Sequence, residues 1–216
     1  MATNALAPRP RNAFVREPDP MQTLLRESAE YPQYGELVDY LSARRMMPPI
    51  SFKAGGGGVF ERNAFFGNEL PKTGVVKVGR FVGPSTVVHE LTHAADNQIT
   101  SQYYDLKNKR GDLTPQERQF MQAYEKLVYD QFGRDKAFPR ENLAQKLNPE
   151  WAKKQGDYRA TSTELPAWGM GSVVDPSNSR EYSAPLHLDP TMATEFSILL
   201  DMARKLQKSQ PVIDKR

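Results

Sequence analysis

The chain has 216 residues, of which 38% are hydrophobic and 25% charged, and its formal net charge is +3 at pH 7. No apolar run reaches the roughly 20 residues of a membrane-spanning helix. The N-terminus lacks the apolar stretch of a secretory signal. The absence of cysteine excludes disulfides and thiolate metal ligands. Basic and acidic residues are interleaved rather than grouped, so we expect a mixed, solvated surface that binds neither nucleic acid nor membrane, in a protein that is cytoplasmic or within a macromolecular assembly.

The first twenty residues contain four prolines and few large apolar side chains. Such a segment has little to bury, which predicts an extended arm over residues 1–20 and a single domain over residues 21–216. An ordered arm of this kind would indicate a partner subunit that holds it.

The segment from Met21 to about Arg44 has an imperfect apolar stripe at helical spacing, which predicts a helix. Pro32 is expected to kink or break this helix, because proline removes a backbone hydrogen bond and clashes with the preceding turn. Pro48 and Pro49 are expected to end the helical region.

The character of the sequence then changes to short apolar segments separated by glycine. Residues 50–52 and 59–60 flank a run of four glycines at 55–58, which predicts a hairpin or a mobile loop. Residues 74–80 (GVVKVGR) have the alternation and bounding glycines of a short strand.

Gly83-Pro84-Ser85 predicts the start of a long helix, with Ser85 as its N-cap, that runs to about Lys107. Thr114 and Glu117 have the spacing of a capping box at the start of a further helix. Its predicted buried face consists of Phe120, Tyr124, Leu127 and Val128.

Residues 133–157 are predicted to be irregular with short helical pieces. Asp189-Pro190 predicts the start of a last amphipathic helix. Its expected apolar side consists of Met192, Phe196, Leu199, Ala203 and Leu206. The order of helix, small sheet and then mostly helix predicts the α+β class.

The segment HELTH, residues 89–93, contains two of the three histidines of the chain. On a helix, residues four apart lie on one face with Cβ atoms about 5–6 Å apart, so His89 and His93 can bind one ion. Glu90 is rotated by about 100° from His89. It therefore stands beside the ion, where it can take a proton from metal-activated water.

A short pattern of this kind also arises by chance on buried helices. Here it lies on a predicted helix after a predicted strand, and apolar Val87, Val88 and Leu91 surround it. This context favours a metal site over coincidence.

The segment 89–94 (HELTHA) also resembles the signature of zincin zinc metallopeptidases and is similar to the active-site helix of thermolysin-type enzymes. The resemblance implies a zincin-like domain in which an edge strand packs on this helix and binds substrate in an extended conformation. It gives that role to residues 74–80.

The segment 157–168 (DYRATSTELPAW) resembles lethal-factor-like gluzincins, in which a tyrosine, a polar turn and a glutamate on a new helix precede an alanine. This resemblance implies that Glu164 is the third zinc ligand and that Tyr158 stabilises the oxyanion. Ser162 or Thr163 could cap the new helix. Glu164 also stands in apolar company, which is costly for a carboxylate unless it is paired or metal-bound.

Three other side chains could also take part in the metal site. Glu117 lies on an apolar helix face, although its capping role explains it, and His187 could be a ligand or a transition-state donor. Asp96 could orient a histidine from behind or face solvent. A metzincin arrangement is excluded, because neither glycine nor histidine follows His93 at the required positions.

The sequence thus predicts a zinc metalloendopeptidase that hydrolyses peptide bonds in a protein or peptide substrate. Its metal ligands would be His89, His93 and Glu164, and its catalytic residues Glu90 and Tyr158. The alternative is a zincin-fold structural or interaction component of a larger assembly, for example a phage-like particle, with or without peptidase activity.

Overall fold

The computed structural model describes residues 19–61, 73–131, 164–174 and 191–209 of the chain. Residues 1–18 of the predicted arm and the predicted irregular region 133–157 lie outside this part. The described elements are, in chain order, α1 (Pro20–Ser28), α2 (Pro32–Ala43), β1 (Ile50–Lys53), β2 (Gly58–Glu61), β3 (Val75–Gly79), α3 (Pro84–Lys107), α4 (Pro115–Tyr124), the π-helix η1 (Glu125–Gln131), α7 (Glu164–Ser172) and α9 (Thr191–Ser209).

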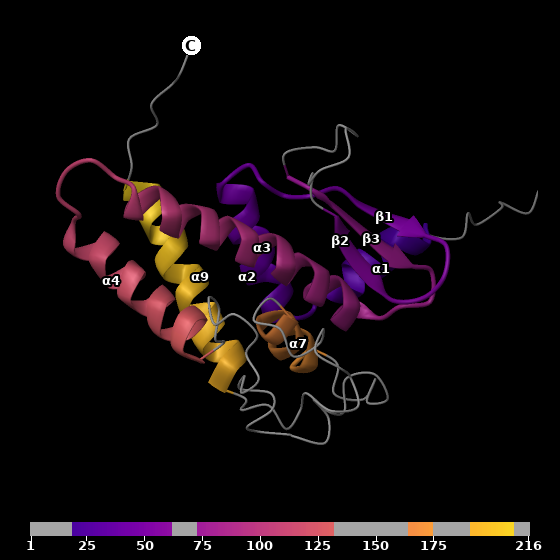
Figure 1. The fold of residues 1–216 in the computed structure, drawn as a ribbon. Coiled ribbons are helices and arrows are strands. Elements are labelled where there is room, and N and C mark those ends of the chain that lie inside the picture. Colours follow the sequence, from indigo (N-terminus) through magenta and orange to yellow (C-terminus); the bar gives the residue numbers. More distant parts are fainter. Residues whose placement is uncertain (1–18, 62–72, 132–163, 175–190, 210–216) are drawn as a thin grey trace, which may run out of the picture.

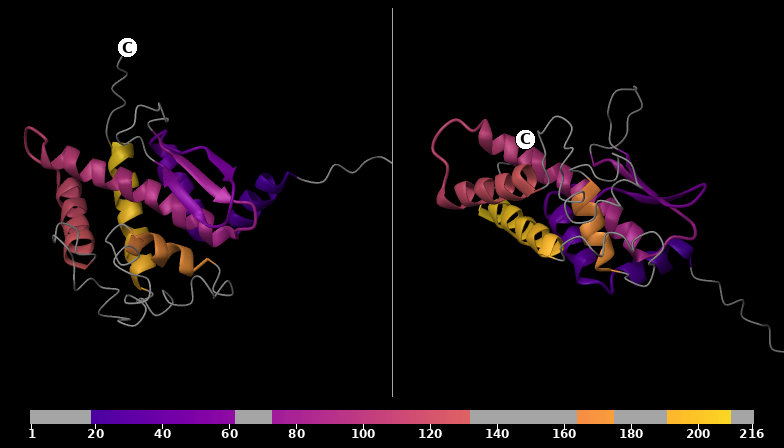
Figure 2. Two further views of the ribbon diagram at one scale, coloured as in Figure 1. Left: turned by 45° about the vertical axis from the view of Figure 1, so that its right-hand side comes forward. Right: turned by 60° about the horizontal axis from the view of Figure 1, so that its bottom comes forward.

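The long helix α3 is the element around which the others are arranged. The three-stranded sheet lies toward its N-terminal end, α4 and α9 lie toward its C-terminal end, and α7 packs beside it (Figures 1 and 2). Buried side chains of all these elements form one core. The predicted α+β class is confirmed.

The two N-terminal helices follow the prediction from proline. α1 ends at Ser28 and α2 begins at Pro32, so the predicted break occurs at that residue. α1 starts at Pro20, where Asp19 caps the helix by accepting a hydrogen bond from the backbone N–H of Met21 at 2.9 Å.

The sheet has the strand order β1-β3-β2, with β1 parallel and β2 antiparallel to β3. The expectation of a hairpin across the glycine run is therefore wrong, because β3 lies between the two strands that the run connects. The alternate residues Val76 and Val78 of β3 are fully buried. This apolar alternation suits a central strand, which buries one face against α3.

The glycine run crosses over the end of β3, where the backbone of Gly79 donates a hydrogen bond to the carbonyl oxygen of Gly57 at 2.8 Å. The two chains approach so closely that a Cβ on Gly79 would lie 2.4 Å from the carbonyl oxygen of Gly55. Glycine at position 79 is therefore a requirement of this crossing.

We expect Gly79→Ala to lower the free energy of unfolding by roughly 1–3 kcal/mol, because the clashing atoms belong to the backbone and must move. Urea denaturation measures the change. Gly56→Ala is the matched control, because a Cβ there meets nothing within 4 Å and the residue does not have a positive φ. Equal midpoints for Gly79→Ala and the wild-type chain would contradict this account of the crossing.

The N-terminus of α3 differs from the prediction in one detail. Gly83 is the N-cap, Pro84 is the first helical residue, and Ser85 is buried inside the first turn, so the prediction that Ser85 caps the helix is wrong. Proline suits the first position, where no backbone N–H is needed. The predicted end of the helix at Lys107 is confirmed.

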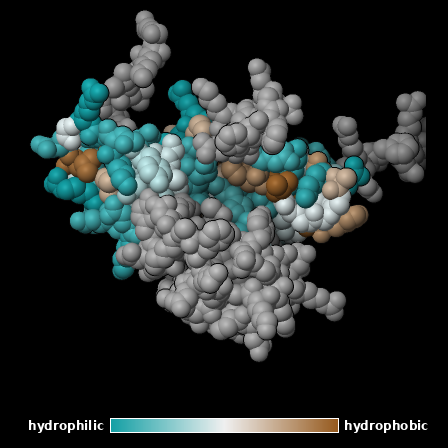
Figure 3. Space-filling model, viewed as in Figure 1, coloured by the Kyte–Doolittle hydropathy of each residue, from teal (hydrophilic) through white to brown (hydrophobic). Residues whose placement is uncertain are grey.

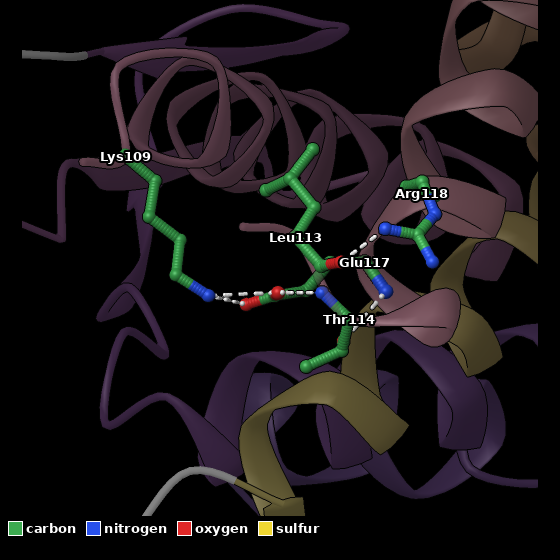
Figure 4. A network of polar contacts seen from close by, with 5 residues as sticks. All are labelled: Lys109, Leu113, Thr114, Glu117 and Arg118. Atoms are coloured by element: carbon green, nitrogen blue, oxygen red, sulfur yellow. Dashed lines mark hydrogen bonds and ion pairs between the residues drawn. The ribbon is translucent and has the colours of Figure 1, made fainter. Parts of the chain in front are cut away.

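The predicted capping box at the start of α4 is confirmed. The hydroxyl of Thr114 accepts from the backbone N–H of Glu117 at 3.2 Å, and the Glu117 carboxylate accepts from the backbone N–H of Thr114 at 2.7 Å. Both carboxylate oxygens of Glu117 also accept from Lys109 Nζ at 2.8 Å (Figure 4). Together these contacts join the end of α3 to the start of α4.

The predicted buried faces of the later helices are also confirmed where the structure describes them. The four residues predicted to be buried after Thr114 are divided between α4 and η1 and lie in the core. In α9 the buried predicted residues are Phe196, Leu199, Ala203 and Leu206. The side chain of Met192 is not among those that the structure describes.

Candidate metal centre

The two histidines of α3 point toward one another, as their spacing predicts. Nε2 of His89 lies 3.2 Å from Nε2 of His93, and the two ring centroids are 4.8 Å apart. His89 is buried and His93 is partly buried. Both nitrogens therefore face one small volume on the side of α3.

Helix α7 brings Glu164 to this volume. Glu164 is the first residue of α7, which packs against α3, and it is 5% exposed. Its Oε2 lies 3.3 Å from Nε2 of His89, and its Oε1 lies 3.5 Å from Nε2 of His93. A contact between residues far apart in the sequence thus completes a group of three metal-ligating side chains.

The spacing of these atoms fits a bound metal ion. In a tetrahedral site with bonds of about 2.0–2.2 Å, neighbouring ligand atoms stand about 3.3–3.6 Å apart. Here the two imidazole nitrogens lie 3.2 Å apart, each is 3.3–3.5 Å from one of the two Glu164 oxygens, and one ligand atom from each residue lies within 4.8 Å of the other two. Two imidazoles and a carboxylate are also a donor set that zinc accepts. Among the described residues, His89, His93 and Glu164 form the group that could hold a metal ion.

Electrostatics favour a cation between these side chains. Burial on its own raises the pKa of the Glu164 carboxyl, but hydrogen bonds and charge from His89 and His93 lower it well below its usual range. Burial lowers the pKa of His93, but the hydrogen bond and charge of Glu164, together with the charges of Glu90 and Asp96, raise it, and the net direction is upward. The carboxylate therefore stays ionised and attracts positive charge, which either protonated histidine or a metal ion can supply.

Trp168 packs on the same site. Its ring meets the ring of His89 edge to face, with centroids 4.7 Å apart, and the side chain is nearly buried. Trp168 lies four residues after Glu164 in α7, which puts both on one face of that helix. The spacing of four residues between Glu164 and Trp168 can be read from the sequence, but the contact of Trp168 with His89 follows only from the packing of α7 on α3.

Glu90 lies beside the group rather than in it, next to the first residue of β2. A Cβ on Gly58 would stand 2.5 Å from Oε1 of Glu90, so only glycine leaves room for this carboxylate. Burial raises the pKa of Glu90 to about 7, and the charge of Glu164 adds to the rise. The charge of His93 and a hydrogen bond from the backbone of Phe60 act in the opposite direction.

The raised pKa of Glu90 predicts a pH-dependent gain in stability for Glu90→Gln in zinc-free protein. Below pH 4.5 the carboxyl is protonated in both states and contributes nothing; as pH rises from 4.5 to about 7, the unfolded chain releases the proton more readily. The ionised carboxylate therefore destabilises the native state, at most by about 3 kcal/mol above pH 7.

We expect the glutamine variant to be more resistant to urea than the wild-type chain at pH 8, and the difference to shrink at pH 5. Both proteins are compared in the presence of a chelator. An advantage that is the same at both pH values would contradict a raised pKa.

The structure distinguishes between the side chains that the sequence left as alternatives. Glu117 is held by Lys109 and the capping box, so it is not part of this group. Asp96 is buried, so the expectation that it faces solvent is wrong. After Glu164 and Glu90, it is a further carboxylate that raises the pKa of His93 against the effect of burial. Tyr158 and His187 lie outside the described residues, and so do Ser162 and Thr163.

The strand beside the site is not the one that the resemblance implied. β3, within residues 74–80, is the central strand, so both its edges are already paired and it cannot add a peptide. β2 is an edge strand within the described sheet and contacts α3. Since Gly57 pairs with Gly79 by a hydrogen bond, the alternate residues Gly58 and Phe60 direct their backbone N–H and C=O groups away from β3.

Comparison with known proteins finds no matching family model, no similar curated protein and no similar solved structure. The described helices include none with the length and apolar character needed to cross a membrane.

Proposed function

We propose that this protein is a zinc-dependent metallopeptidase in which His89, His93 and Glu164 hold the zinc ion and Glu90 is the general base. The observation that carries the proposal is the convergence of two imidazoles and a carboxylate within zinc-ligand spacing, with a second buried carboxylate beside them at the edge of a strand.

When bound, zinc supplies a Lewis acid and lowers the pKa of water to about 7. Glu90 is suited to accept a proton and later return it to the leaving amine, because its carboxylate lies beside the proposed zinc ligands and not among them. Tyr158 remains the proposed donor to the oxyanion, on the strength of the sequence resemblance alone.

The outer edge of β2, which has no partner strand within the described sheet, supports a peptide as the substrate. Gly58 and Phe60 turn backbone groups toward the side of the sheet next to Glu90, where the N–H of Phe60 already donates to the Glu90 carboxylate. An extended peptide can form ladder hydrogen bonds with such an edge. A strand added there would bring one of its peptide bonds next to the candidate metal centre.

Metal analysis combined with a cleavage assay tests the proposal. We expect about one zinc ion per chain and cleavage of a denatured protein substrate such as casein, with loss of cleavage after chelator treatment and recovery when zinc is restored. A chain that takes up no zinc even when zinc is supplied would overturn the proposal. A zinc-loaded chain that cleaves none of a broad peptide library would leave a metal site without the proposed activity.

The alternative of a zincin-fold component of an assembly depends on the N-terminal arm. Of residues 1–20 the structure describes Asp19 and Pro20, which belong to the start of α1. Among the described residues no observation favours this alternative, and it stays a hypothesis.

A further inference from the structure

A groove at the end of the sheet has features that the fold and the proposed metal centre do not require. Its lining includes Phe52 and Lys53 at the end of β1, Gly55 and Gly56 of the glycine run, and Arg80 and Phe81 in the turn between β3 and α3. We refer to these six residues as the glycine-run groove. It is open to solvent and combines two cationic with two aromatic side chains.

The two cations of the groove have no ion-pair partner in the part of the protein that the structure describes. Lys77 of the same sheet forms an ion pair with Glu61 at 2.6 Å. Within the described ranges, neither Lys53 nor Arg80 has a carboxylate within ion-pair distance. Among the described residues, the groove thus has two cationic side chains without an ion-pair partner, which favours an acidic ligand.

Phe81 adds an apolar contact surface to these charges. Its side chain is 100% exposed, although it lies only two residues after the end of the central strand β3. On the face shown in Figure 3 the described surface is largely hydrophilic, and hydrophobic residues interrupt it at both ends, including the end that carries the sheet. A cationic groove with an exposed aromatic ring suits a peptide that has a carboxylate next to an apolar side chain.

The groove adjoins the candidate metal centre. The glycine run continues directly into β2, whose first residue, Gly58, is in contact with the Glu90 carboxylate. Although burial dominates the pKa of Glu90, the positive charge of Lys53 is near enough to act against it. An extended peptide advances about 3.3 Å per residue, so a peptide on the outer edge of β2 reaches the groove within a few residues.

We propose that the glycine-run groove binds an acidic segment of a peptide, with a carboxylate between Lys53 and Arg80 and a neighbouring apolar side chain on Phe81. Together with the proposed function, on which this second step rests, the groove makes the preferred substrate a peptide with acidic residues on one side of the cleaved bond. Binding of the acidic segment itself requires neither zinc nor hydrolysis.

Fluorescence polarisation tests the binding with two labelled probes, which differ only in charge. One has the central sequence Asp-Phe-Glu-Leu flanked by alanines, and the other has Asn-Phe-Gln-Leu in its place. The protein is the full chain carrying Glu90→Gln, which prevents turnover of the probe. We expect the acidic probe to bind at least about 10-fold more tightly, with an affinity that falls as sodium chloride is raised.

The double variant Lys53→Gln/Arg80→Gln should lose this difference, and Phe81→Ser should weaken the acidic probe further. Lys77→Gln is the matched control, because it removes a cation of the same sheet that already has a partner, and it should leave the difference intact. Circular dichroism verifies that each variant is folded. Equal binding of the two probes to the parent chain, or an undiminished difference in the double variant, would overturn the proposal.

Cleavage of a peptide library then separates this proposal from the proposed function. We expect acidic residues to be enriched on one side of the sites that the wild-type chain cleaves, and the enrichment to disappear in Lys53→Gln/Arg80→Gln. A chain that cleaves nothing fails the proposed function, while the polarisation result decides the groove independently. Cleavage sites without acidic enrichment would overturn the substrate preference.

Discussion

Replacing Glu90 with glutamine is expected to lower the rate of peptide hydrolysis by about 10²–10⁴-fold while the zinc content of the protein stays unchanged. Glutamine keeps the shape of the side chain but cannot accept a proton. Since Glu90 lies beside the three candidate ligands and not among them, its replacement would remove the proposed proton acceptor and leave the proposed zinc ligands in place. Initial cleavage rates and elemental analysis of the same preparations measure the two effects.

The zinc content provides the control for this variant. A preparation that has lost zinc as well as activity would show that Glu90 acts on the ligands rather than on the substrate. A variant that retains both zinc and more than a tenth of the wild-type rate would contradict the assignment of Glu90 as the general base.

Replacing Glu164 with alanine is expected to weaken zinc binding by more than about 100-fold, which exceeds the effect usual for side chains that only orient ligands. The variant leaves two imidazole ligands, whereas zinc sites in proteins usually have at least three protein ligands. Hydrogen bonds and charge from His89 and His93 also stabilise the ionised form of Glu164. Loss of Glu164 therefore alters the surroundings of both histidines. Competition with a chromophoric chelator measures the zinc affinity.

Glu117→Ala is the matched control, because Glu117 is also a glutamate that is 5% exposed and sits in the first turn of a helix. Its removal should cost about 1 kcal/mol of stability through the lost capping box and leave zinc binding unchanged. Retention of zinc by Glu164→Ala with loss in Glu117→Ala would reverse the two assignments. Retention by both would direct the search for a third ligand to His187.

Most of the helical boundaries could be predicted because their causes are local. Pro32 separates α1 from α2, and Thr114 with Glu117 starts α4, as the sequence indicated. Each of these signals acts within a few residues of the backbone that it affects. The prediction that Ser85 caps α3 failed within such a local range, since Gly83 and Pro84 already start the helix and Ser85 lies in its first turn.

The sheet was less predictable because strand pairing is a contact between distant residues. The glycine run indicated a turn, but the sequence did not show that β3 would enter between β1 and β2. This insertion changes which strand could take the substrate-binding role that the resemblance implied. It pairs both edges of β3 and makes β2, next to Glu90, an edge strand of the described sheet.

The sequence by itself determined the half of the candidate centre that one helix holds. Helical periodicity brings His89 and His93 to one face and turns Glu90 to their side, whatever the rest of the fold does. Only the tertiary structure decided which of several distant side chains joins them, because the packing of α7 on α3 brings Glu164 within 3.3 Å of His89. Contacts between elements depend on the burial of whole apolar faces, and no local pattern specifies which two faces meet.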